Sequence, residues 1–135
     1  MYNVYNSEYI RGGGRRFLTS AYYGVFSLTD APQRQINGRF LMILHTVCFK
    51  LKKGESAKKA TEVLLSMRGN VPSALKIEAG EDILHSARSY DVILQVTVKD
   101  RAALDEYQKD EYHCGVVKKH MHAVTETSVA VDTEI

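Results

Sequence analysis

The order of hydrophobic periodicities after residue 40 restricts the fold more than any other feature of this sequence. Two long segments, 41–51 and 90–100, alternate along the chain with the period of two that is typical of β-strands. Shorter alternating segments at 73–80 and 123–132 predict two further strands. The folded part of the chain is therefore expected to contain four strands.

Two helical segments separate these strands. The first, residues 56–68, has Ser56 as its predicted N-cap and Gly69 as its predicted C-cap. The second begins after Asp100 and is broken before a piece with an inward stripe at i, i+3, i+4 and i+7, namely His113, Val116, Val117 and His120. The resulting β-α-β-β-α-β order predicts an α+β protein. It is typical of the ferredoxin-like split βαβ fold, in which the helices cover one face of a four-stranded antiparallel sheet.

The sheet face turned away from the helices has a mixed composition. Its residues from the two long strands are Met42, Leu44, Thr46, Cys48, Ile93, Gln95 and Thr97. Such a face is too apolar for free exposure to solvent and too polar for a closed core. The pattern therefore predicts a homodimer in which two sheets pack face to face.

Residues 1–39 differ from the rest of the chain. They contain five of its eight tyrosines and a run of three glycines before two arginines, and no strand or helix period persists. We interpret residues 1–39 as a flexible or peripherally docked arm and residues 40–135 as the folded domain. The arm is either an upstream extension without a structural role or a segment that covers a partner subunit or an acidic surface.

Deletion of residues 1–39 is expected to change the melting temperature by only a few degrees, on the order of 1 kcal/mol, because no periodic burial is predicted there. Thermal unfolding of the full and shortened chains, followed by circular dichroism, measures the difference. A shortened chain that is insoluble would show instead that the arm belongs to the fold or to the dimer.

Charge and composition argue against two classes of protein. The formal net charge is +2 and residues 40–135 are nearly neutral, so the domain lacks the basic stripe of a nucleic-acid-binding protein. No run of 18 apolar residues occurs, so no membrane span is expected.

Cys48 and Cys114 make no disulfide framework, and the N-terminus has no apolar signal core. We therefore expect a cytoplasmic protein.

Three protonatable side chains are predicted to point into the layer between sheet and helices. His45 shares a strand face with four large apolar residues, while Tyr107 and His113 lie on inward helical stripes. Unpaired buried polar groups are costly, so the three are either structural and hydrogen-bonded or part of a hydrated site suited to proton transfer. The histidines and cysteine at 113–122 match no standard zinc spacing, so no metal is expected.

Three stretches resemble the stress-responsive dimeric A/B barrel (Dabb) family. They are MILHTVCFKLKKG, SYDVILQVTVKDRAALDEYQKDEYHCGVVKK and SVAVDTE, and the resemblance covers about residues 41–133. It implies a ferredoxin-like subunit that pairs through its sheet into a dimeric α+β barrel. Many members of the family have no assigned activity.

The site pattern is similar to one branch of that family, the plant olivetolic acid cyclase, which closes a linear polyketide by aldol condensation. This resemblance implies that His113 is a general base acting next to a carbonyl, and that Tyr107 donates a hydrogen bond to the oxyanion. Leu64 stands where the cyclase has a pocket tyrosine. The predicted substrate contacts are His45, Phe49, Leu64 and Val117, and no cofactor is expected.

Three functional classes remain open. The first, which we favour, is a small dimeric protein that binds a small hydrophobic ligand and has no assigned activity. The second is a cofactor-independent cyclase, isomerase or lyase that removes a proton next to a carbonyl. The third is a haem- or quinone-type monooxygenase, which is least favoured because the chain has no tryptophan and no haem-ligand pattern. A closed, dry pocket around His45 and His113 would favour a structural role, and a pocket open to solvent would favour catalysis.

Overall fold

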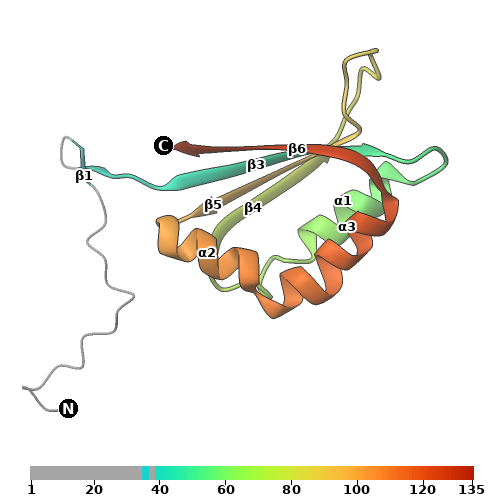
Figure 1. Cartoon of the computed structure of the whole chain (residues 1–135). Coiled ribbons are helices and arrows are strands. Elements are labelled where there is room, and N and C mark those ends of the chain that lie inside the picture. The colour runs from blue at the N-terminus through green and yellow to red at the C-terminus, as the bar shows by residue number, and fades with distance from the viewer. Residues whose placement is uncertain (1–34, 37–38) are drawn as a thin grey trace, which may run out of the picture.

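A four-stranded antiparallel sheet with helices on one face forms the centre of the computed structural model, which describes residues 35–36 and 39–135 (Figure 1). The strand order in the sheet is β4-β5-β3-β6. The elements are β1 (Gln35–Ile36), β2 (Arg39–Phe40), β3 (Ile43–Leu51), α1 (Ala57–Leu65), β4 (Ala74–Glu81), β5 (Val92–Val98), α2 (Arg101–Lys109), the π-helix η1 (His113–Lys118), α3 (Lys119–Val124) and β6 (Thr125–Glu134). The predicted ferredoxin-like α+β fold is confirmed.

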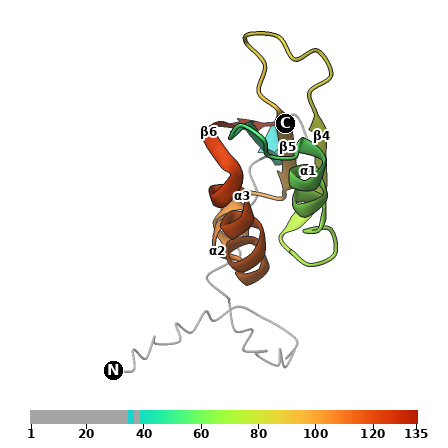
Figure 2. The same ribbon diagram turned by 90° about the vertical axis from the view of Figure 1, so that its right-hand side faces the viewer.

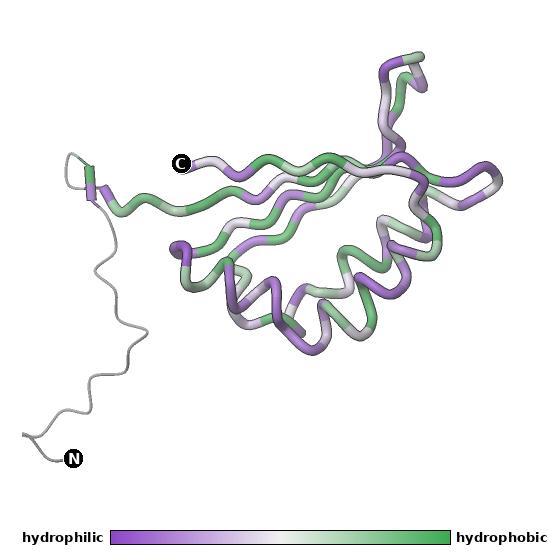
Figure 3. The backbone as a smooth tube through the Cα atoms, in the orientation of Figure 1, coloured by the Kyte–Doolittle hydropathy of each residue, from purple (hydrophilic) through white to green (hydrophobic). Residues whose placement is uncertain are grey.

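β3 lies in the middle of the sheet, between β5 and β6. β3 and β5 are rich in hydrophobic residues (Figure 3), and their helix-facing positions include the buried Val47, Leu94 and Val96. The residues of β6 are mostly exposed. Opposite residues of an antiparallel pair share a face. His45 is opposite Val96 of β5 on one side and opposite Asp132 of β6 on the other. The register therefore brings an acidic residue beside the strand histidine.

α1 begins as predicted but ends earlier than predicted. The Ser56 side chain accepts a hydrogen bond from the backbone of Lys59 at 3.2 Å, which caps the first turn. The helix ends at Leu65, where the Ser66 hydroxyl donates back to the Val63 carbonyl at 2.6 Å. Gly69 has a φ of +77° in the turns that follow, so its prediction as the C-cap of this helix was wrong.

The second helical segment is broken at Asp110, as the sequence predicts. Asp100 caps α2 through a 2.9 Å bond from the Ala103 backbone, and the extended backbone of Asp110, with ψ of 135°, ends the helix. Beyond this break the chain continues through η1 directly into α3. The π-helical turn itself was not predicted, because a sequence period of 3.6 assumes α-helical geometry.

The inward stripe of this segment differs from the predicted one because of the π-turn. Val116 was predicted to face the sheet, but its side chain is 46% exposed. The residues that face the sheet here are His113, Val117, Met121 and Val124. Hydrogen bonds of the i→i+5 type widen the turn, so the next inward position after His113 is i+4 alone rather than both i+3 and i+4.

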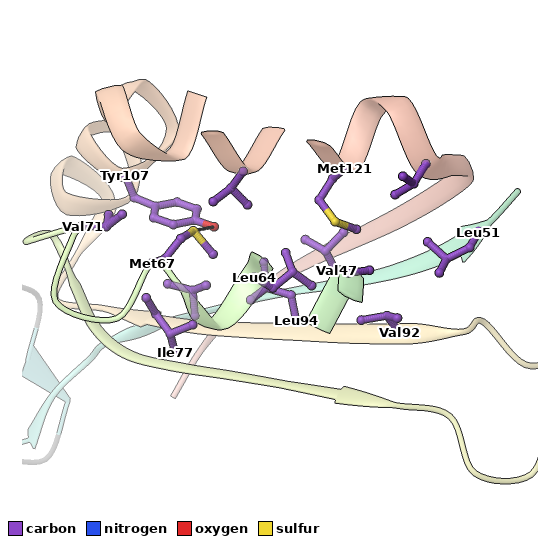
Figure 4. Packing of buried hydrophobic residues seen from close by; sticks show 14 of the residues in the cluster. Val47, Leu51, Leu64, Met67, Val71, Ile77, Val92, Leu94, Tyr107 and Met121 are labelled. Atoms are coloured by element: carbon purple, nitrogen blue, oxygen red, sulfur yellow. Dashed lines mark hydrogen bonds between the residues drawn. The ribbon is translucent and has the colours of Figure 1, made fainter. Parts of the chain in front are cut away.

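The core fills the space between the sheet and the helices (Figure 4). Its fully buried members include Leu64 and Met67 from the region of α1, and Tyr107 from α2. Figure 4 shows the Tyr107 hydroxyl pointing toward the sulfur of Met67, inside this layer. A tyrosine is thus a central packing element of an otherwise aliphatic core.

The opposite face of the sheet is open. Figures 1 and 2 agree that α1, α2 and α3 lie on one side of the sheet, while the connection 82–91 between β4 and β5 projects toward the other. On this open face Ile93, Val129 and Val131 are exposed, and Cys48 is partly covered. No helix in the described part has the length and apolar character needed to cross a membrane.

Most of the predicted N-terminal arm, residues 1–39, lies outside the described residues. The exceptions are β1 and the first residue of β2, which pair with each other in a short antiparallel ladder of exposed residues. This ladder is separate from the four-stranded sheet.

Candidate functional site

A cavity of about 270 Å³ lies between the sheet and the helical segment η1–α3. All six residues predicted for the site line it: His45, Phe49, Leu64, Tyr107, His113 and Val117. Val47, Leu94 and Met121 add further apolar wall. On the β6 side the lining includes Ser128 and Ala130, which are exposed, so the cavity opens to solvent along this edge strand.

Hydrogen bonds to residues that shortly precede it in the chain fix the position of His113. It is the first residue of η1, is 6% exposed, and its backbone N–H donates to the Asp110 carboxylate at 2.9 Å. Its ring Nδ1 lies 2.8 Å from the Tyr107 carbonyl oxygen, which only accepts, so Nδ1 is the protonated nitrogen. The neutral ring therefore has its lone pair on Nε2, where a general base needs it.

Burial lowers the pKa of His113 below its ordinary value of 6.5, because the charged ring loses its hydration. The hydrogen bond to Tyr107 acts in the opposite direction, and the Lys118 ammonium lowers the pKa further. His113 is thus neutral at pH 7 and available to take a proton.

The lowered pKa of His113 predicts a loss of stability in mild acid. The unfolded chain takes up a proton on this residue near pH 6.5, while the folded chain does so only at lower pH. The contribution of His113 to the unfolding free energy should therefore level off above about pH 7 and fall below about pH 6.5, by at most about 1.4 kcal/mol per pH unit, until the folded-state pKa is reached. Urea unfolding of wild type and His113→Gln between pH 7.5 and 5 measures this. A wild-type-minus-variant difference that is independent of pH would contradict it.

Tyr107 packs between the two histidines. Its ring stacks on that of His113, with centroids 4.2 Å apart and an interplanar angle of 23°, and lies 5.7 Å from that of His45. Burial raises the pKa of its hydroxyl well above the ordinary value of 10.0, so the group stays a donor. The partner of this donor is the Met67 sulfur at 3.8 Å, which is a weak acceptor.

His45 forms a pair with Asp132, a residue that sequence reasoning missed. Its Nδ1 lies 2.6 Å from the Asp132 carboxylate, at directly opposite positions of β3 and β6. The carboxylate accepts from Nδ1 and so orients the ring. Asp132 alternates with the outward-facing Val129 and Val131, which is a signal for its inward direction, but its pairing with His45 depends on a register that the sequence does not reveal.

A π-helical turn carries His113 into the cavity. Short π-helical segments are rare and occur often at functional sites. In this segment the wide turn directs His113, Val117 and Lys118 toward the cavity, while Cys114 and Val116 are exposed. Within the described residues no group of three His, Cys, Asp or Glu side chains is placed to hold a metal ion.

Comparisons with known proteins agree on one family and one fold. The family model of the stress responsive A/B barrel domain matches residues 43–135. A search of the curated proteins finds no significant match. The similar solved structures include a dimeric ferredoxin-like protein of unknown function from Bacteroides fragilis, with 19% identity and a TM-score of 0.61 over 70% of this chain and 96% of that one.

Two other solved structures extend this set. A Dabb family protein from Mesorhizobium loti has 21% identity and a TM-score of 0.55, and the match covers 69% of this chain and 95% of that one. A hydroxynitrile lyase from Passiflora edulis has 17% identity and a TM-score of 0.57, with 70% of this chain and 93% of that one covered. At such identities the likeness shows the fold. Because the family model covers the whole four-stranded domain, the chain belongs to the stress responsive A/B barrel domain family.

Proposed function

We propose that this family member binds a small, largely apolar carbonyl compound in the cavity between β3 and η1. The observation that carries the proposal is a solvent-open cavity whose walls are aliphatic and whose polar groups converge at one place, around His113 and Tyr107. Such a combination of apolar walls with a few placed polar groups is typical of ligand sites. A structural pair of histidines would have no need of an open cavity beside it.

Ligand binding can be tested with 2-octanone, followed by NMR chemical shifts. We expect shifts at methyl groups of Leu64 and Val117, and loss of these shifts in Ala130→Trp, which fills the mouth from an exposed position on β6. The matched control is Val116→Trp, which adds the same side chain at an exposed position outside the cavity lining. Unchanged binding in Ala130→Trp would place the ligand elsewhere.

A second function, cyclase- or isomerase-type proton transfer, is favoured by the hydrogen bonding of His113 and Tyr107. The Nε2 lone pair of His113 is suited to remove a proton next to the ligand carbonyl, since Nδ1 is occupied by the Tyr107 carbonyl. The Tyr107 hydroxyl, bonded only weakly to sulfur, is suited to donate to the enolate oxygen that forms. These roles are similar to those in olivetolic acid cyclase. The Passiflora edulis neighbour is a lyase of the same fold, but at 17% identity it lends no support to a shared activity.

Proton transfer can be detected without knowing the natural substrate. In D₂O, the protein should increase the incorporation of deuterium next to the carbonyl of 2-octanone, which proton and deuterium NMR measure directly. Binding of the ketone without any increase in exchange would leave a ligand-binding protein and exclude the catalytic role.

We also propose that two copies pack through the open sheet face into a dimeric barrel. Support comes from the exposed Ile93, Val129 and Val131 on that face and from neighbours described as dimeric. Light scattering at micromolar concentration should give a dimer, and Val131→Lys should give a folded monomer, because an interface of about 1,600 Å² would bury an unpaired charge. Val116→Lys, on the helical side, should remain dimeric. A wild-type monomer would refute the proposal.

A cytoplasmic location is proposed from the state of the cysteines. Cys48 and Cys114 are both free thiols, and the family domain contains no disulfide between them. Free thiols persist in reducing compartments.

A further inference from the structure

The charge on the cavity wall is one-sided. Among the described residues that line the cavity, Lys118 is the one lysine or arginine, and no aspartate or glutamate is present. The carboxylates next to the lining, Asp132 and Asp110, are bound by the His45 ring and by the His113 backbone N–H. The remaining polar members are Gln108, hydroxyl groups and histidines. A cavity of this kind favours a ligand with a negative charge over a neutral or positive one.

Lys118 is held in place but lacks a counter-ion. Its Nζ donates to the Gln108 backbone carbonyl at 3.1 Å and to the Gln108 side-chain oxygen at 3.3 Å, in a partly buried setting. An ammonium group has three donors, so one remains for a ligand. In the described part of the chain no carboxylate pairs with Lys118, whereas Lys50 and Lys76 have carboxylate partners at 3.1 and 3.0 Å.

The π-turn accounts for the position of Lys118. In an α-helix a residue five positions after His113 would lie well round the helix from it, because each turn takes 3.6 residues. In η1, bonded from i to i+5, Lys118 lies one wide turn after His113 and both line the cavity. The ammonium is close enough to lower the pKa of His113. An anion bound at Lys118 would thus lie beside the proposed base.

We infer that the ligands of this protein are small carboxylates with an aliphatic or aromatic body, and that Lys118 binds the carboxylate while the apolar wall holds the body. The inference rests on the proposed ligand-binding cavity and adds to it the class of ligand. A charge-assisted hydrogen bond from a preplaced ammonium to a carboxylate is stronger than one to a neutral amide. A neutral molecule of the same shape therefore binds less tightly.

Isothermal titration at pH 8 with octanoate and octanamide tests the inference, since the two probes differ in charge but hardly in shape. Wild type should bind octanoate at least tenfold more tightly than octanamide. Lys118→Met, which keeps most of the length of the side chain without its charge, should reduce this preference to less than twofold. Lys118→Gln is a second variant of the same kind. Lys119→Met, at the exposed neighbouring position outside the lining, should keep the full preference.

The possible outcomes distinguish the role of Lys118 from the existence of the ligand-binding cavity. Equal binding of both probes by wild type, or a preference that persists in Lys118→Met and Lys118→Gln, would overturn the role of Lys118 while leaving the ligand cavity in place. Failure of wild type to bind either probe would overturn the cavity proposal together with this inference.

Discussion

Replacing His113 with glutamine is expected to slow deuterium exchange next to the carbonyl of 2-octanone by about 10²–10⁴-fold, the usual contribution of a positioned general base. Glutamine keeps a polar side chain with amide N–H donors in reach of this region, which the Tyr107 carbonyl can accept from. It has no nitrogen that accepts a proton near neutral pH. The fold should therefore remain while proton transfer is lost, which NMR exchange rates and a thermal unfolding curve measure together.

The matched control is His120→Gln, the same substitution at a histidine of α3 that does not line the cavity. Its exchange rate should equal that of wild type. Equal rates for His113→Gln and wild type would show that His113 is not the base. The alternative would then be His45, whose Nδ1 is engaged by Asp132 and whose Nε2 is the remaining nitrogen.

Truncation of Tyr107 to alanine is expected to have the largest effect on stability. The side chain is fully buried between the sheet and the helices (Figure 4). Its ring also contacts the rings of both histidines. Removal of a large buried aromatic group costs about 3–5 kcal/mol, through lost burial and the cavity left behind. This is a large part of the total stability of an ordinary domain. Urea unfolding curves measure the difference.

Tyr107→Phe separates the packing role of this residue from the role of its hydroxyl. Stability should change by less than about 1 kcal/mol, because the partner lost within the described residues is the weakly accepting Met67 sulfur at 3.8 Å. Deuterium exchange should nevertheless fall about 10²–10³-fold, the typical loss when one oxyanion donor is removed. Tyr112→Phe, which removes a hydroxyl bonded to Ser66 outside the cavity, is the control and should keep the wild-type rate. A normal exchange rate in Tyr107→Phe would exclude the donor role.

The sequence predicts the layers of this fold better than its turns. Alternation along β3 and β5 is a local property of the chain, and it identifies the inward residues correctly. The end of α1 depends instead on the bond from Ser66 to Val63, and the exposure of Val116 depends on a π-turn. Neither feature is visible in the hydrophobic pattern. A helical period alone therefore predicts the wrong end for α1 and the wrong exposure for Val116.

The same distinction holds for the candidate site, where the faces of elements could be predicted and the contacts set by strand register or turn type could not. His45, Tyr107 and His113 could be placed together, because each lies on an inward side of an element whose partner layer is known from the fold. Asp132 could not be paired with His45, since the two are 87 positions apart and their contact depends on the register of β3 with β6. Lys118 could not be placed in the cavity, because its direction depends on the π-turn.

The orientations of the two histidine rings differ in how readily a mutation can change them. The ring of His45 is oriented by the side chain of Asp132, so a single codon change at position 132 can release it. The ring of His113 is oriented by the backbone carbonyl of Tyr107, a group that every amino acid carries. No substitution at position 107 deletes that acceptor. Within a family of diverse members, the tautomer of His113 can therefore persist while the side chains around it are replaced.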